Sequence, residues 1–172
     1  MRVFFALALP GPAREAVAAV LAGLRDPGVS WTRPENLHIT LRFCGEVEDV
    51  DALAEAVAPA ARRHVLSEVR LVGGGAFPDT RRPRVLWIGV EGALAPLAAD
   101  LDAAVRAFGL LAERLPFAPH LTVGRVRAGV PRAAAASLAG LGEVARFVPA
   151  HVTMYASVLS REGPRYEALR EL

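Results

Sequence analysis

The sequence predicts an α+β fold made of two pseudo-symmetric lobes, each a mainly antiparallel sheet with flanking helices, and a cleft between them. Three observations lead to this prediction. Strand and helix patterns alternate along the chain, the sequence matches itself at an offset of 82 residues, and one short motif recurs at the same place in both copies. The chain has 172 residues, a typical length for one domain, so we assign residues 1–172 to a single bilobal domain.

The first copy begins with an apolar segment, residues 3–9, that proline residues end. Charged residues follow soon after, which favours a buried strand over a signal peptide. Asp49 or Asp51 is expected to cap the second helix. The elements predicted for this copy are a strand at 3–9, a helix at 12–25, a strand at 37–43, a helix ending near 64 and a strand at 65–72.

The second copy repeats the order strand, helix, strand, helix, strand. Its predicted elements are a strand at 84–90, a helix at 94–108, strands at 121–126, 148–160 and 165–169, and a short helix at 131–138. The glycine run at 73–75 is expected to be a turn. We place the internal repeat at approximately 3–77 and 85–160.

Composition excludes several classes of protein. Hydrophobic residues make up 53% and charged residues 22%, which excludes a disordered chain. No apolar run approaches the roughly 20 residues that a membrane-spanning helix needs. Cys44 is the only cysteine, so no intramolecular disulfide can form. We expect a cytoplasmic monomer without a membrane partner.

Arginine supplies all of the basic residues, 20 in total, and lysine is absent. Arg81, Arg82 and Arg84 stand close together, and the planar guanidinium suits phosphate oxygens. For this group, however, we favour a solvated face over a phosphate contact.

Histidine and threonine recur together. Three of the four histidines have threonine two residues later, and residues i and i+2 of a strand share a face. The pairs His38/Thr40 and His120/Thr122 occupy the same place in the two copies. Facing each other over a cleft, they could hold one phosphate, with one imidazole as acid and the other as base. His151 stands at a different repeat position, so we expect a structural role for it.

Three neighbouring residues are candidates for binding substrate. Arg125 reaches the cleft only if its strand bulges or ends first, because strict alternation points it to the other face. Arg42 has the right parity but lies near the cleft edge. Phe43 is a candidate for stacking a terminal base.

The segments 36–43 (NLHITLRF) and 117–125 (FAPHLTVGR) resemble the two motifs of the two-histidine phosphoesterases. They are most similar to the bacterial and archaeal RNA 2′,3′-cyclic phosphodiesterases, once called 2′-5′ RNA ligases. The resemblance extends over nearly the whole chain and departs at Cys44, where the family often has leucine. It implies an enzyme without metal or cofactor that hydrolyses 2′,3′-cyclic phosphate ends of RNA or nucleotides to 2′-phosphates. It also implies His38 as proton donor and His120 as proton acceptor.

Other functions stay open at this point. The same cleft could join a cyclic phosphate end to a 5′-hydroxyl through a 2′-5′ bond, or act on a small cyclic nucleotide or a 2′-5′ oligonucleotide. A non-catalytic RNA-binding module is a further alternative, which the intact histidine–threonine pairs disfavour.

Overall fold

The protein is described here by a computed structural model that covers residues 1–24, 26–160 and 163–172. Its helices are α1 (Gly11–Ala22), α2 (Val50–Arg62), α3 (Ala95–Ala107) and α4 (Arg132–Ala139), with a 3₁₀ turn η1 (Pro34–Asn36). Its strands are β1 (Arg2–Ala8), β2 (Val29–Trp31), β3 (His38–Glu46), β4 (Val69–Phe77), β5 (Val85–Glu91), β6 (His120–Val126), β7 (Glu143–Phe147), β8 (Val152–Ser160) and β9 (Gly163–Glu171).

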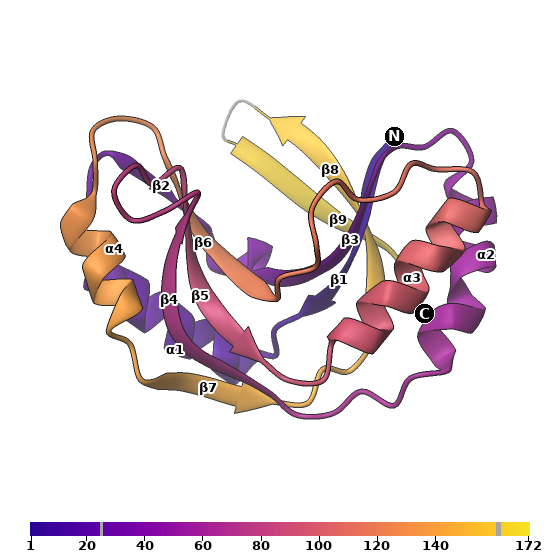
Figure 1. The fold of residues 1–172 in the computed structure, drawn as a ribbon, viewed down its shortest axis with the longest axis horizontal. Helices are drawn as coiled ribbons and strands as arrows, with labels where there is room; N and C mark the ends of the chain where they lie inside the picture. Colours follow the sequence, from indigo (N-terminus) through magenta and orange to yellow (C-terminus); the bar gives the residue numbers. More distant parts are fainter. Residues whose placement is uncertain (25, 161–162) are drawn as a thin grey trace.

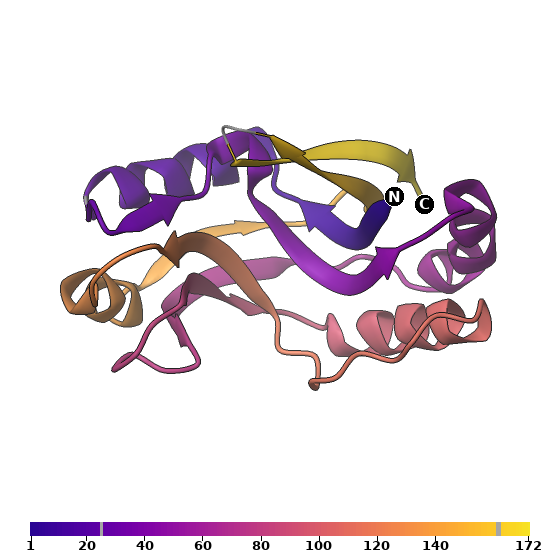
Figure 2. The same cartoon turned by 90° about the horizontal axis from the view of Figure 1, so that it is seen from above.

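The strands form one curved antiparallel sheet in the order β7-β4-β5-β6-β3-β1-β8-β9, and β2 pairs with β6. The sheet divides into two halves of four strands, which lie one above the other in Figure 2. The halves meet where β3 pairs with β6, at Ile39 opposite Leu121. The predicted α+β fold of two pseudo-symmetric, mainly antiparallel lobes is therefore confirmed.

The third strand of each copy lies in the other copy's half of the sheet. β4 follows α2 in sequence, but it pairs with β5 and β7. β8 follows α4, but it pairs with β1. We did not predict this exchange, because the repeat gives the order of the elements and not their partners.

The helices stand at the two ends of the sheet (Figure 1). α2 and α3 pack against each other at one end, while α4 packs on β4 and α1 on β7 at the other. Asp49 caps α2, since its carboxylate accepts a hydrogen bond from the Ala52 amide at 2.9 Å. That cap was one of the two predicted.

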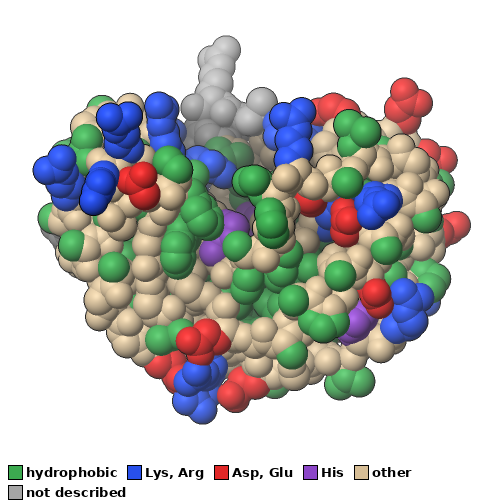
Figure 3. Space-filling view, in the orientation of Figure 1, with side chains coloured by type: hydrophobic (Ala, Val, Ile, Leu, Met, Phe, Trp, Pro, Cys, Tyr) green, Lys and Arg blue, Asp and Glu red, His purple; other side chains and the backbone are tan. Residues whose placement is uncertain are grey.

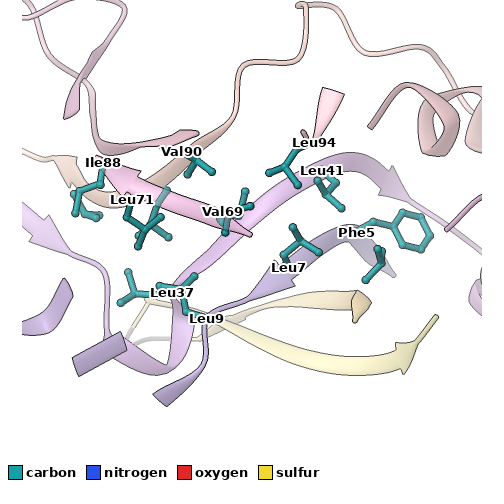
Figure 4. Close-up of a cluster of buried hydrophobic side chains, with 14 of the residues drawn as sticks. Phe5, Leu7, Leu9, Leu37, Leu41, Val69, Leu71, Ile88, Val90 and Leu94 are labelled. Carbon is teal, nitrogen blue, oxygen red and sulfur yellow. The ribbon is translucent and has the colours of Figure 1, made fainter. Parts of the chain in front are cut away.

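The core lies on the sheet face opposite the cleft. Side chains from both halves meet there, including Leu7 and Leu41 of one half and Leu71 and Ile88 of the other (Figure 4). All four are 4% exposed or less. Because one apolar cluster spans both halves, it holds them together and fixes the opposite face as the floor of the cleft.

Three local predictions were wrong. The glycine run at 73–75 belongs to β4 and forms no turn between strands: a Cβ on Gly75 would lie 2.7 Å from the Trp87 ring, and Gly73 has a φ of +63° at a register shift of the strand. The short strands β2 and β7 were missed. The strands predicted at 65–72 and 148–160 begin only at Val69 and Val152.

Candidate active site

The register between β3 and β6 brings the two histidine–threonine pairs together. Ile39 and Leu121 are partners and are fully buried on the core face. In an antiparallel pair, their neighbours point to the opposite face and lie opposite each other, so His38 faces Thr122 across the strands and Thr40 faces His120. Two imidazoles and two hydroxyls from the two halves thus form a compact square on the cleft face.

Both imidazoles are held in the same orientation. Nδ1 of His38 lies 2.7 Å from the carbonyl oxygen of Asn36, and Nδ1 of His120 lies 2.7 Å from that of Ala118. A carbonyl only accepts, so in each ring Nδ1–H donates and Nε2 is the nitrogen that carries or takes the exchangeable proton. The equivalent bond in both halves leaves two Nε2 atoms for a substrate.

Aromatic rings surround the two histidines unequally. The His38 ring lies 4.9 Å from Phe4 and 4.8 Å from Tyr166, centroid to centroid, while His120 has the edge of Phe77 at 5.0 Å. Burial lowers the pKa of His38. The bond to the Asn36 carbonyl opposes this shift, and the nearby charges of His120 and Arg125 add to it.

Two adjoining pockets form the cleft. The smaller, of about 500 Å³, is lined by His38 and Thr122, and the larger, of about 940 Å³, by His120 and Thr40. Phe43 and Arg125 line both pockets and so mark their junction. Figure 3 shows this hollow near the middle of the molecule, with histidine side chains on its floor and hydrophobic side chains on its walls.

Two equivalent bulges place Phe43 and Arg125 at that junction. On β3, Phe5 pairs with Arg42 and Ala6 with Thr40, so Leu41 is an extra residue. On β6, the pairing skips from Gly124 to Thr122, so Val123 is the extra residue at the corresponding repeat position. Each bulge reverses the parity of the strand that follows. This is the condition under which we expected Arg125 to reach the cleft.

The bulge on β3 pairs Arg42 with Phe5, on the other face from Thr40, so the parity that we expected for it is wrong, although Arg42 still lines the larger pocket. Arg42 is 3% exposed, and its Nε donates to Asp102 at 2.7 Å. Its remaining nitrogens contact the carbonyl oxygens of Phe43 and Leu111, and Glu113 lies at 3.5 Å. These contacts indicate that Arg42 holds α3 and the segment after it against β3, and its contact with substrate stays a prediction.

The remaining histidines and the cysteine lie outside the square. His151 is 52% exposed and 3.7 Å from the Glu171 carboxylate. His64, just after the end of α2, contacts Asp100 in the middle of α3 at 2.9 Å. Burial raises the pKa of the Cys44 thiol to about 12, so it is a poor nucleophile.

Sequence reasoning assigned no site role to several residues that line the cleft. They are Trp31, Asn36 and Tyr166 in the smaller pocket and Phe77 in the larger. Asn36 could have been found, because it stands two residues before His38 and its carbonyl orients that ring. Its side-chain amide also donates to the Pro164 carbonyl at 2.9 Å, which ties η1 to β9. Phe77 and Tyr166 come from distant segments and carry no local signal.

The residues that the structure describes form neither a cluster of metal ligands nor a membrane-spanning helix. Among those that the structure describes, no three His, Cys, Asp or Glu side chains are grouped so that they could hold a metal ion. No helix within the described ranges is long and apolar enough to cross a bilayer.

Comparison with known proteins identifies the family. The model of the family LigT like Phosphoesterase matches residues 7–87 and again 88–166. The RNA 2′,3′-cyclic phosphodiesterase of Archaeoglobus fulgidus is 35% identical over 99% of this chain and 98% of its own length. That of Methanothermobacter thermautotrophicus is 34% identical over 96% of this chain and 95% of its own.

Solved structures agree with this result. A protein of Thermus thermophilus superposes with a TM-score of 0.82 at 27% identity, covering 99% of this chain and 96% of that one. The complex of E. coli LigT with 3′-AMP gives a TM-score of 0.77, with the same identity and coverage. The chain belongs to the LigT-like phosphoesterase family, which confirms the resemblance and the prediction of a phosphoesterase enzyme.

Proposed function

We propose that this protein hydrolyses 2′,3′-cyclic phosphate ends of RNA, leaving a 2′-phosphate, by acid–base catalysis between His38 and His120. The observation that carries the proposal is the square of two imidazoles and two hydroxyls at the Ile39–Leu121 pair. The names of relatives that match nearly the whole chain support the substrate.

The proposed reaction uses the two Nε2 atoms on opposite sides of one phosphate. A water molecule loses a proton to His120 as it attacks phosphorus, the bond from phosphorus to O3′ breaks, and His38 gives its proton to O3′. Thr40, Thr122 and Arg125 donate to the phosphoryl oxygens, on which negative charge grows in the transition state. His120 ends the reaction with one proton more and His38 with one proton fewer. The next turnover therefore requires only that each exchanges a proton with solvent.

Substrate charge helps to set the protonation of His38. In the empty cleft its pKa is lowered, which favours the neutral ring. A bound phosphodiester brings a negative charge that offsets those of Arg125 and His120, so the protonated ring that a donor needs becomes more stable when substrate is present. We therefore keep His38 as the proposed donor.

The terminal base is proposed to stack on Phe43. This ring is 49% exposed and lies where the two pockets meet, so one face of a base can cover it while the phosphate occupies the square. The existence of a complex of the E. coli relative with 3′-AMP supports binding of a nucleotide. Ligation through a 2′-5′ bond would use the same groups, and the high concentration of water favours hydrolysis.

The test offers the protein, in excess EDTA, a panel of cyclic-phosphate-ended RNAs and small nucleotides, with products assigned as 2′- or 3′-phosphates. We expect 2′-phosphates and undiminished activity in the chelator, since the imidazoles do the proton transfer. Activity lost in EDTA and restored by one divalent ion would reject the metal-independent mechanism. The same preparations, analysed by size, test the proposed monomer, and fractionation of cells tests the proposed cytoplasmic location.

A further inference from the structure

The two segments that follow β3 and β6 carry opposite charge, although the repeat relates those two strands. Residues 46–51 connect β3 to α2 and contain four exposed carboxylates and no basic residue. Residues 127–132, between β6 and α4, contain two exposed arginines and no acidic residue. Figure 3 shows mainly blue side chains on one side of the hollow, and red and blue ones mixed on the other. A polyanion is repelled by the segment after β3 and attracted by the segment after β6, whose Arg127 lines the smaller pocket.

The β4–β5 connection adds basic residues beside the segment after β6. Val85 pairs with Arg125, and the Val126 amide donates to the Arg84 carbonyl at 2.9 Å, so this connection is bonded to β6 next to the cleft. Arg84 lines the larger pocket, and Arg127 lines the smaller one. Arg81 and Arg82 are exposed just beyond them. These four residues, Arg81, Arg82, Arg84 and Arg127, are called the arginine rim below.

The conformation of the β4–β5 connection does not depend on the side chains of Arg81 and Arg82. The Asp79 carboxylate accepts hydrogen bonds from the backbone amides of Arg81 at 2.7 Å and Arg82 at 3.0 Å. Within the described ranges, no carboxylate forms an ion pair with either guanidinium. Two forked donors are therefore presented to solvent on a turn that backbone bonds already hold.

We propose that the arginine rim binds the phosphates of an RNA strand that runs out of the cleft past Arg125, so that the substrate is the end of a polymer and not a free cyclic mononucleotide. This inference rests on the proposed function. From His120 to Arg127 the strand covers about 20 Å, at the usual rise of ~3.3 Å per residue. That length accommodates several phosphates of a single strand at ~3.4 Å or more per nucleotide. Guanidinium–phosphate contacts would position the strand without reading its sequence.

The experiment compares two substrates in three proteins. The substrates are adenosine 2′,3′-cyclic phosphate and a short single-stranded RNA with a 2′,3′-cyclic phosphate end. The proteins are the natural chain, the double variant Arg81→Gln/Arg82→Gln, and the control Arg62→Gln/Arg63→Gln. The control removes two adjacent exposed arginines at the end of α2, on the far side of the molecule (Figure 1).

We expect the rim variant to raise KM for the RNA by roughly 2- to 30-fold, which is the combined effect of two exposed charge contacts. The ratio of kcat/KM for RNA to that for the mononucleotide should fall by the same factor. The plot of log KM against log salt should lose about 1.4 from its slope, since each contact with a single strand contributes ~0.7. The control should keep the natural ratio and slope.

An unchanged ratio in the rim variant overturns the inference but leaves the proposed hydrolysis standing. The inference is also overturned, and the proposed hydrolysis again stands, if the natural protein prefers the mononucleotide or if its KM for RNA does not change with salt concentration. A natural protein that hydrolyses neither substrate rejects the proposed function itself. Binding of RNA ending in a 2′-phosphate, followed by fluorescence anisotropy, then still reports whether the rim holds RNA.

Discussion

Arg42→Met separates a structural arginine from a substrate-binding one. The guanidinium contacts Asp102 and Glu113, and the two carboxylates are 27% and 41% exposed. Removing one member of a buried ion pair costs about 3–5 kcal/mol. Water still reaches both carboxylates, so we expect the lower end, a loss of about 3 kcal/mol in the free energy of unfolding. For a chain of this length, that lowers Tm by roughly 6–12 °C.

The assay is urea unfolding beside steady-state kinetics, with Arg125→Met as the matched control. Arg125 is exposed and points into the cleft, so its variant should stay within about 0.5 kcal/mol of the natural stability while losing activity. The reasoning is refuted if Arg42→Met keeps the natural unfolding midpoint and loses activity as Arg125→Met does, because Arg42 would then act on substrate.

The remaining predictions concern the histidines. Replacing His38 or His120 by Ala should each lower kcat by about 10²–10⁴-fold, and the double variant should not multiply the losses, because both act on one phosphate. A substrate whose leaving group needs no protonation should rescue His38→Ala and not His120→Ala; the opposite rescue would reverse the two roles. The pKa of His38, followed by NMR, should rise in His120→Ala, because the positive charge that lowers it is removed. His151→Ala should keep kcat, since the side chain lies outside both pockets; a loss as large as that of a folded His38→Ala would contradict the repeat argument.

The four catalytic candidates could be predicted from the sequence. The alternation of side chains along each of the two motif strands, together with the internal repeat, is enough to bring them together. Residues i and i+2 share a face, and the same motif occurs in both copies, so the two pairs had to face a common space once the lobes met. The pairing of Ile39 with Leu121 supplies what the repeat alone does not, namely which imidazole faces which hydroxyl.

The residues after the square could not be placed in the same way, because a bulge changes parity without a local sequence signal. Leu41 and Val123 are ordinary apolar strand residues, yet each is the extra residue that reverses the faces after it. Arg42 was therefore expected on the cleft side and is buried, whereas Arg125 needed the bulge in order to reach the cleft.

The other features that the sequence did not predict correctly depend on contacts between residues that are distant in the sequence. Gly73–Gly75 resembles a turn until the Trp87 ring is found against it, and this contact comes from the neighbouring strand β5. β2 has three residues and β7 five, too few for a periodicity to stand out. Each is a strand only because another strand pairs with it.

The exchange of β4 and β8 makes each half of the sheet depend on the other half of the gene. If the chain is cut in the β4–β5 connection, the first fragment lacks the strand that covers β1, and the second lacks the strand that covers β5. Neither fragment can complete its sheet alone, but two copies of either one can each donate the missing third strand to the other. A single ancestral unit would thus have been a strand-swapped homodimer, with one histidine–threonine pair from each subunit.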